Sequence, residues 1–308
     1  MMAARRLGTA GGIRGRVLRD EPMSRHTSWR VGGPADCYFE PADMQDLALF
    51  LAGLPAGEPL LWIGLGSNLL VRDGGVRGTV INSSGLSELE WVEDGRLRVE
   101  AGVPCAKVAR TSARAGYTGA EFLCGIPGSM GGALAMNAGA FGGETWAIVE
   151  RAETIDRSGN LRTRERNEFG IGYREVRMPA AEEWFVAAVL TVQPDPQRGG
   201  EARIRDLLAR RSATQPTGQP SCGSVFRNPP EDHAGRLIEV AGLKGRRVGG
   251  AFVSEKHANF IITEDGARAS DVESLIDLVQ REVEARDGIP LLPEVRIVGE
   301  HQRGSDDG

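Results

Sequence analysis

The sequence predicts an α+β protein built from three successive units. Residues 20–83 alternate short strands with a helix, residues 86–195 have an antiparallel, strand-rich pattern, and residues 201–299 are mostly helical. With 308 residues, of which 41% are hydrophobic and 26% charged, the chain has an ordinary globular composition. At roughly 100–200 residues per domain, its length allows two or three domains.

The first unit has a βαββ pattern. Residues 36–40 and 79–82 read as strands, and residues 59–71 as a strand that runs into a glycine turn. Between them, apolar residues at helical spacing predict a helix within residues 42–54. Residues 1–19 carry charge without a long apolar segment, so we expect a disordered leader there and not a secretory signal.

The second unit begins with a hairpin signal, Asp94-Gly95, between two alternating runs. Pro104 is expected to open a helix that closes near Gly116. Residues 149–156, 161–166 and 182–194 read as strands, with a turn at 156–159. The Pro- and Gly-rich residues 193–201 are the best candidate for a linker.

The third unit predicts helices at residues 201–211, 236–245 and 269–288, then a strand at 294–298. Ser270 and Glu273 have the spacing of a capping box at the start of the longest helix. Residues 301–308 read as a solvated tail.

Composition excludes several functions. A formal net charge of −5 argues against a general nucleic-acid binder. The 4 cysteines show no CxxC spacing and the 4 histidines no HxxxH pair, so we expect no metal site and no disulfide framework. Reduced thiols suit a cytoplasmic protein. No apolar run is long enough to cross a membrane, and no obligate protein partner is evident.

Residues 125–143 contain seven glycines in nineteen positions, and no Lys, Arg or His. Apolar residues interleave with these glycines, which indicates packed backbone rather than a flexible linker. Ser129 is placed to cap a short helix whose free N–H groups could bind a pyrophosphate. A glycine-packed turn between sheets remains the alternative.

Two further stretches have polar groups in turns. Gly64 and Gly66 follow an apolar strand, but Leu69 stands where the dinucleotide fingerprint needs glycine, so the Rossmann context fails and a tight hairpin is the alternative. Ser224 lies in "SCGSVFRNP" without the glycine that a nucleophile elbow needs two residues later. A loop serine is its simplest interpretation.

The ordered set of motifs resembles one family, the UDP-N-acetylenolpyruvoylglucosamine reductases, flavoenzymes that complete UDP-N-acetylmuramate in bacterial wall synthesis. The motifs are "HTSWRVGGPAD", "GLGSNLLV", "GIPGSMGGALAMNAGA", "GYR", "GSVFRNP", "LIEVAGLKG", "GGAFVSEKHANFI" and "LLPEVRIVG". Each is weak alone, but together they cover nearly the whole chain after residue 19.

The resemblance implies two subdomains, at residues 20–84 and 85–198, that hold FAD non-covalently as vanillyl-alcohol-oxidase/PCMH flavoproteins do. A substrate-binding domain follows at 199–300. NADPH is the implied co-substrate and UDP-N-acetylglucosamine enolpyruvate the substrate. The implied FAD-binding residues are Gly64, Gly66, Ser67, Asn68, Leu69, Gly125, Ile126, Pro127, Gly128, Ser129, Gly132, Ala133, Asn137 and Gly139.

The family's catalytic residues correspond to Arg174, Ser224 and Glu294 in this chain. In the implied reaction, Arg174 stabilises developing negative charge, Ser224 delivers a proton, and Glu294 has to carry a proton in order to help. Substrate contacts are implied at Tyr173, Arg227, Asn228, Lys244, Lys256, His257 and Asn259.

Two departures from the family pattern matter. Val176 stands where the family often has a serine, so an orienting hydrogen bond on Arg174 is lost or supplied elsewhere. No tyrosine lies in the third unit, which places the chain in the subtype without a tyrosine clamp over the nucleotide.

Two alternatives stay open. One is another flavin oxidase of the same cofactor fold, with FAD attached covalently; no His lies between residues 27 and 232, which leaves Cys105 and Cys124 as attachment points. The other is a non-catalytic nucleotide-sugar-binding relative. The visible spectrum of the pure protein, with and without NADPH, separates all three.

Overall fold

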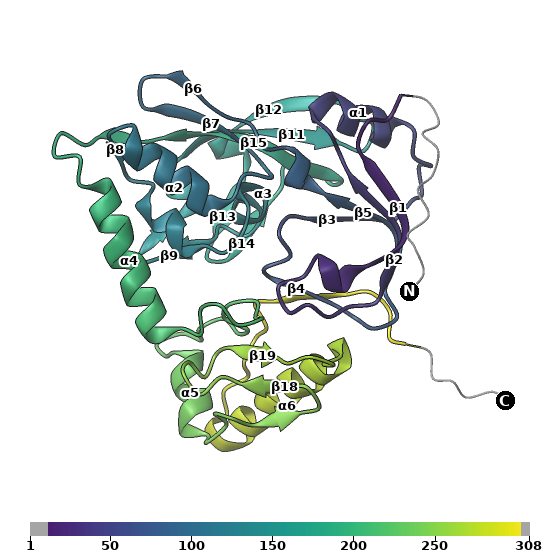
Figure 1. The fold of residues 1–308 in the computed structure, drawn as a ribbon, viewed down its shortest axis with the longest axis vertical. Helices are drawn as coiled ribbons and strands as arrows, with labels where there is room; N and C mark the ends of the chain where they lie inside the picture. Colours follow the sequence, from purple (N-terminus) through teal and green to yellow (C-terminus); the bar gives the residue numbers. More distant parts are fainter. Residues whose placement is uncertain (1–11, 303–308) are drawn as a thin grey trace. The chain divides into compact units, whose positions relative to one another are not determined.

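The computed structural model describes residues 12–302 of the chain (Figure 1). The chain forms two compact structural units, which differ from the three units of the sequence pattern and interleave along the sequence. The first unit contains residues 12–19, 38–65 and 79–211, and the second contains residues 20–37, 66–78 and 212–302. The three-domain boundaries expected from the sequence stay a prediction.

The first unit contains a five-stranded antiparallel sheet with the order β12-β11-β15-β7-β6. Its strands are β6 (Leu89–Glu93), β7 (Arg96–Glu100), β11 (Val149–Asp156), β12 (Leu161–Glu165) and β15 (Glu183–Thr191). The hairpin expected at Asp94-Gly95 is confirmed, because β6 and β7 pair on either side of it. The strands expected within residues 149–194 are confirmed as well.

Two helices share a hydrophobic core with this sheet, α2 (Cys105–Arg114) and α3 (Met130–Ala135). As the sequence predicts, α2 begins directly after Pro104 and ends before Gly116. The core that these elements build is fully buried and includes Leu97, Val99, Val108, Leu134, Ala188 and Leu190.

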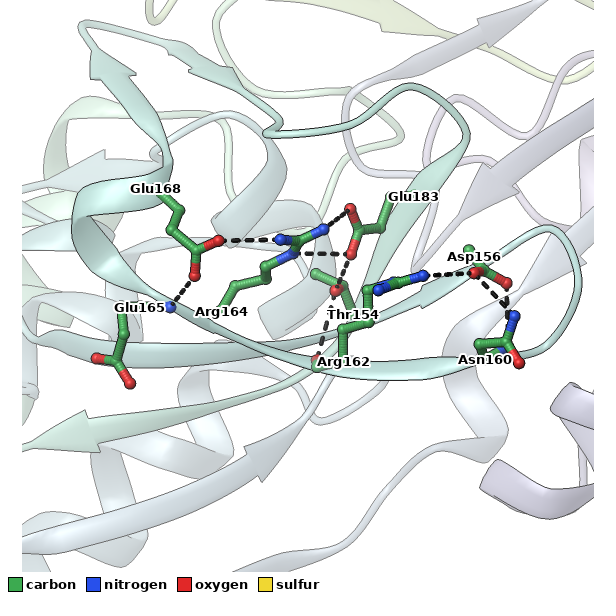
Figure 2. Close-up of polar contacts among 8 residues, drawn as sticks. All are labelled: Thr154, Asp156, Asn160, Arg162, Arg164, Glu165, Glu168 and Glu183. Atoms are coloured by element: carbon green, nitrogen blue, oxygen red, sulfur yellow. Dashed lines mark hydrogen bonds and ion pairs between the residues drawn. The ribbon is translucent and has the colours of Figure 1, made fainter.

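Three strands of this sheet carry a cluster of polar contacts (Figure 2). Glu183 is only 4% exposed, and its carboxylate accepts hydrogen bonds from Thr154 Oγ1 and from Arg164 Nε and Nη2. Asp156 accepts from the backbone N–H groups of Ser158 and Asn160, so it holds the turn expected at residues 156–159. The carboxylates of Asp156, Glu168 and Glu183 therefore all have protein partners.

A four-stranded sheet has the order β1-β2-β5-β3. Its strands are β1 (Arg16–Pro22), β2 (Pro34–Glu40), β3 (Leu60–Ile63) and β5 (Val76–Asn82). The helix α1 (Met44–Ala52) connects β2 to β3, and Asp43 caps it by accepting a hydrogen bond from Asp46 N. The predicted βαββ pattern is thus confirmed.

Short strand pairs complete the first unit. They are β8 (Tyr117–Thr118) with β16 (Gln193–Pro194), β9 (Gly139–Ala140) with β10 (Gly143–Glu144), and β13 (Gly170–Gly172) with β14 (Glu175–Arg177). The stretch 193–201, expected to be a linker, instead belongs to this unit: β16 pairs with β8, and Asp195 N donates to Gly116 O. The helix α4 (Gly200–Thr214) follows.

The second unit combines a three-stranded sheet with two helices. The strands β17 (Arg247–Val248), β18 (Ala251–Val253) and β19 (Ile261–Thr263) are antiparallel, and the helices are α5 (Ala234–Val240) and α6 (Ala269–Asp287). Separately, β4 (Leu69–Val71) pairs in parallel with β20 (Arg296–Val298). Trp29, Val31 and Leu70 pack into one core with residues of α5 and α6.

Two expectations are corrected here. The leader was expected over residues 1–19, but residues 16–19 belong to β1; residues 1–11, and residues 303–308 of the expected tail, lie outside the described residues. Ser270 and Glu273 form no capping box. The Asp73 carboxylate accepts from the first backbone N–H groups of α6, while Glu273 pairs with Arg72 at 2.8 Å.

Candidate functional site

In the first unit, the structure brings together the two glycine motifs. Ser129 is the N-cap residue of α3, as expected, but its side chain does not cap the helix. Its Oγ is buried and has no hydrogen-bond partner among residues 12–302. A Cβ atom at Gly64 would lie only 2.1 Å from this Oγ, so the end of β3 meets the start of α3.

The first N–H groups of α3 are not free. Met130 N donates to Val103 O at 2.9 Å, and Gly131 N donates to Ala101 O at 2.8 Å. Both groups are therefore bonded to neighbouring backbone, which corrects the expectation of free N–H groups for a phosphate at Met130 and Gly131.

Several glycines of residues 125–143 are required by close packing within the first unit. A Cβ at Gly125 would lie 2.4 Å from the Phe141 ring, and one at Gly143 would lie 2.6 Å from the Phe122 ring. At Gly132, in contrast, a Cβ would meet nothing within 4 Å. Gly132 is thus the glycine of α3 whose missing side chain leaves open space.

Asn137 ties the glycine run to the following segments. It is 1% exposed and has a positive φ of 45°. Its Oδ1 accepts from Trp146 N at 3.1 Å, and its Nδ2 donates to Glu144 Oε2 at 3.0 Å and to Gly172 O at 3.1 Å. Its side-chain amide is therefore bound within the protein at both ends.

Arg174 lies in the two-residue turn between β13 and β14, with φ at +55°. Its Nη1 donates to Asn137 O at 3.4 Å and its Nη2 to Gly139 O at 3.2 Å. Tyr173, beside it in the turn, is 54% exposed, and the Arg174 guanidinium lies 5.5 Å from its ring centroid. Backbone carbonyls of the glycine run thus orient Arg174, whereas Val176 packs against the core.

In the second unit, the stretch Gly66–Leu69 joins the segment that carries Glu294. Gly66 has a φ of +63°, and a Cβ there would lie 1.9 Å from His26 O. Asn68 Nδ2 donates to Glu294 O at 3.1 Å. The tight hairpin considered as an alternative for residues 64–71 is wrong, because β3 and β4 belong to different sheets.

Ser224 and Glu294 are also brought together in the second unit. Before Ser224, the Cys222 thiol contacts the carbonyl oxygens of Gly66 and Leu69. After it, Val225 O accepts a hydrogen bond from Glu294 N at 2.7 Å. Ser224 and Glu294 are both half-buried, so each side chain is held by buried neighbours and remains partly accessible.

The residues expected to contact substrate have varied surroundings. Arg227 Nε is buried and has no hydrogen-bond partner among residues 12–302. Lys244 pairs with Glu239 at 2.7 Å, Lys256 Nζ donates to Ser212 O, and Asn228 Oδ1 accepts from Ala234 N at the start of α5. The remaining two residues lie side by side: Asn259 N donates to His257 Nδ1 at 3.3 Å, and burial lowers the pKa of His257.

The cysteines are poorly suited to covalent chemistry. All four are buried and free. Burial raises the pKa of the Cys105 thiol to about 12 and also raises the pKa of Cys124, whereas attachment to a flavin needs a reactive thiolate. Among residues 12–302, no group of three or more His, Cys, Asp or Glu side chains could hold a metal ion, and no helix is long and apolar enough to cross a membrane.

Two models of known protein families match this chain. Residues 35–164 match the model of an FAD binding domain, and residues 215–298 match that of the UDP-N-acetylenolpyruvoylglucosamine reductase C-terminal domain. The reductase of Alkalilimnicola ehrlichii is 57% identical over 98% of this chain and 100% of its own length. The reductase of Methylococcus capsulatus is 57% identical over 96% of this chain and 97% of its own.

The chain belongs to the UDP-N-acetylenolpyruvoylglucosamine reductase family.

The crystal structure of the Thermus caldophilus reductase agrees with this membership: it has a TM-score of 0.79 and 33% identity over 92% of this chain and 98% of its own. The α+β fold with an FAD-binding unit, expected from the sequence, is confirmed. The roles of individual residues in this reductase stay predictions.

The first unit offers observations that fit bound FAD. Ser129 Oγ is a buried hydroxyl that still lacks a partner among residues 12–302, beside Gly64. Gly132, three residues further on, faces open space. An unpartnered buried hydroxyl is costly unless a ligand or water completes its hydrogen bonds. Together they make the start of α3 a suitable place for a polar part of the cofactor.

The sequence did not indicate which residues join separate segments of the chain through their side-chain hydrogen bonds. Asn137 and Asn259 were expected to contact ligands, yet their amides are used within the protein. One signal was available for Asn137, because asparagine tolerates positive φ better than most residues. Phe141, at φ +53°, had no such signal.

Proposed function

We propose that this chain reduces the enolpyruvyl group of UDP-N-acetylglucosamine enolpyruvate to give UDP-N-acetylmuramate, with FAD as cofactor and NADPH as reductant, in peptidoglycan precursor synthesis. One observation carries this proposal. Ser224 directly precedes Val225, and Glu294 N donates to Val225 O, inside the region that matches the reductase C-terminal domain. The reaction takes place in the cytoplasm, which four free, buried cysteines support.

FAD is held non-covalently by residues of both glycine motifs. When bound, it would supply the redox chemistry by which a hydride, two electrons and one proton, passes from NADPH to the substrate's methylene carbon. Ser129 and Gly132 are the binding residues best supported by geometry. The other residues proposed to line the cofactor are Gly64, Gly66, Ser67, Asn68, Leu69, Gly125, Ile126, Pro127, Gly128, Ala133, Asn137 and Gly139.

Arg174 stabilises the negative charge that develops on the enolpyruvyl group as its double bond is reduced. A guanidinium suits this role because it stays charged and presents several donors in one plane. Hydrogen bonds to Asn137 O and Gly139 O fix its orientation beforehand, and preorganised donors need no reorganisation during the reaction. These carbonyls supply orienting bonds in place of a serine at residue 176.

Ser224 delivers the proton to the carbon next to the methylene carbon, where the negative charge has developed. A hydroxyl is a weak acid, so a neighbouring group has to assist it. Glu294 is held next to the same segment, and in its protonated form it donates a hydrogen bond where negative charge develops. Arg227 supports binding of the anionic substrate, because its buried Nε has no protein partner among residues 12–302.

Ser224→Ala tests this function in two half-reactions. Under anaerobic conditions NADPH should bleach the flavin of the wild-type protein and the enolpyruvyl substrate should restore the colour. In Ser224→Ala, bleaching and FAD content should hardly change, while reoxidation by the substrate slows roughly 10²–10⁴-fold, the usual worth of a positioned acid. Stopped-flow absorbance resolves the two steps.

Other outcomes point elsewhere. A wild-type flavin that NADPH bleaches but the enolpyruvyl substrate never reoxidises contradicts the proposed reaction. Yellow colour that stays with the acid-precipitated protein favours a covalent flavin oxidase, and a colourless protein favours a non-catalytic relative. If both half-reactions slow together in Ser224→Ala, the hydroxyl supports the shape of the site rather than its chemistry.

A further inference from the structure

Asn259 lies next to the segment that carries Ser224, and both ends of its side-chain amide are bonded there. The residue is 4% exposed. Its Oδ1 accepts a hydrogen bond from Phe226 N at 2.9 Å, and its Nδ2 donates to Phe226 O at 2.9 Å. Its backbone oxygen also accepts from Val225 N at 2.9 Å. Three hydrogen bonds from one residue thus fix the two residues that follow Ser224.

The same two residues hold the segment of Glu294. Val225 O accepts from Glu294 N at 2.7 Å, and Phe226 forms an antiparallel bridge with Pro293. Val225 is therefore bound to Asn259 through its N–H group and to Glu294 through its carbonyl. A shift of Asn259 would be transmitted through this one residue, Val225, to both proposed proton-handling residues.

Ser224 depends on this support because of what precedes it. Gly223 has a φ of +72°, and a Cβ there would meet nothing within 4 Å. Glycine is the residue with the greatest backbone freedom. The orientation of Ser224 is consequently determined mainly from its C-terminal side, where Val225 and Phe226 are buried.

We propose that Asn259 is a positioning residue that holds Ser224 and Glu294 in register for protonation of the substrate. This inference rests on the proposed reductase function. It replaces a direct substrate contact at Asn259, because both ends of the amide already bind Phe226.

Two substitutions test the proposal. Asn259→Leu has a similar size but can make neither side-chain hydrogen bond. Asn259→Asp keeps the shape and still accepts from Phe226 N, but when ionised it faces the Phe226 carbonyl with a negative charge. Asp271→Ala is the matched control, because the Asp271 side chain also makes two hydrogen bonds to backbone, from Gly250 N and Arg268 N, elsewhere in the same unit.

Both Asn259 variants should bind FAD and be bleached by NADPH like the wild type. Reoxidation by the enolpyruvyl substrate should slow about 10²-fold, the effect of a misplacement near 1 Å, with unchanged substrate affinity in a flavin spectral titration. Hydrogen exchange at the Val225 and Phe226 amides should accelerate. In Asn259→Asp, reoxidation should recover as pH falls, because the protonated carboxyl donates to Phe226 O again. Asp271→Ala should show none of these changes.

Several results would overturn the proposal. Weaker substrate binding with a normal reoxidation rate at saturation would make Asn259 a substrate contact. Equal slowing of both half-reactions would make it a purely structural residue, as would unchanged exchange at Phe226. A wild-type protein that the enolpyruvyl substrate does not reoxidise would instead overturn the proposed function. Normal wild-type turnover together with fully active Asn259 variants would reject only the positioning role.

Discussion

The glycines of residues 125–143 serve two different physical needs. At Gly125, Gly139 and Gly143, a side chain would collide with other residues of the first unit, since a Cβ would lie 2.4–2.6 Å from the nearest atom. At Gly132 no such neighbour exists within 4 Å. Protein packing therefore requires glycine at the first three positions, whereas no described residue requires it at Gly132, and a role for Gly132 in binding FAD stays a prediction.

The neighbouring glycines of α3 allow a matched test of this distinction. Gly132→Val should leave the stability of the apoprotein nearly unchanged and abolish flavin absorbance. In Gly131→Val, the new Cβ would lie 2.9 Å from Ala101 Cβ, so the apoprotein should lose about 1–3 kcal/mol, as overpacked cores do. Thermal unfolding of the two apoproteins, with flavin absorbance of the purified proteins, provides the comparison.

The FAD content of Gly132→Val can exclude α3 from the cofactor site. A Gly132→Val protein that purifies with its full complement of FAD would remove α3 from the cofactor site. A large loss of apoprotein stability in the same variant would instead mean that the open space is filled in solution by protein.

Candidate site residues could be proposed from the sequence, but their partners could not. Arg174, Ser224 and Glu294 were expected from the family resemblance of the motifs that contain them, and their roles stay predictions. The use of Asn259 could not, because Phe226 lies 33 residues away and nothing in either local sequence indicates the contact. Asn137 likewise reaches Gly172, 35 residues further on. Such hydrogen bonds depend on tertiary packing, which local patterns do not encode.

At the scale of elements, the buried carboxylate of Glu183 joins β11, β12 and β15 (Figure 2). Burial alone would raise the pKa of Glu183, but hydrogen bonds from Arg164 and Thr154 outweigh it and lower the pKa below its usual value. A carboxyl with a lowered folded-state pKa stabilises the protein above its unfolded pKa of about 4.3, and this contribution is lost as pH falls through the folded-state pKa.

Glu183→Gln should therefore destabilise the protein near pH 7 by about 1.5–3 kcal/mol, the usual worth of hydrogen bonds to a charged group. The difference from wild type should shrink as pH falls below 4, because wild-type Glu183 is then protonated too. Urea unfolding at pH 7 and at lower pH measures both values. Glu168→Gln is the control: Glu168 also binds Arg164 but is more exposed, so its loss should be smaller. A pH-independent difference for Glu183→Gln would contradict the electrostatic explanation.

Local patterns predicted the elements well where the pairing is local, and failed where a distant residue competes. The β6–β7 hairpin follows from Asp94-Gly95, because the turn residues determine it. The start of α6 does not follow from Ser270 and Glu273, because Asp73, 196 residues from Ala269 in the chain, accepts the hydrogen bonds that the capping box would have satisfied. The parallel pairing of β4 with β20 is equally invisible in either local sequence.

At the scale of the whole molecule, the interleaving of the two units determines what can fold alone. The region that matches the reductase C-terminal domain, residues 215–298, is continuous, but the core of the second unit is not. Trp29 is fully buried in that core, its Nε1 donates to Ile261 O at 2.7 Å, and its carbonyl oxygen accepts from Thr263 Oγ1 at 2.6 Å. Leu70 of β4 is fully buried in the same core.

We therefore expect residues 212–302, expressed alone, to lack a cooperative fold. The fragment leaves out Trp29, Val31 and Leu70, so apolar surface of α5 and α6 stays exposed to water. Its amide NMR spectrum should be poorly dispersed, and its circular dichroism should show no cooperative thermal transition. In the intact chain, Trp29→Ala should cost about 3–5 kcal/mol, as for other large buried aromatics, whereas Trp91→Ala, at a 37% exposed position, should cost much less. A fragment that unfolds cooperatively, or an intact Trp29→Ala protein as stable as Trp91→Ala, would contradict this expectation. Either result would show that the C-terminal region folds without the earlier segments and that they add little to its stability.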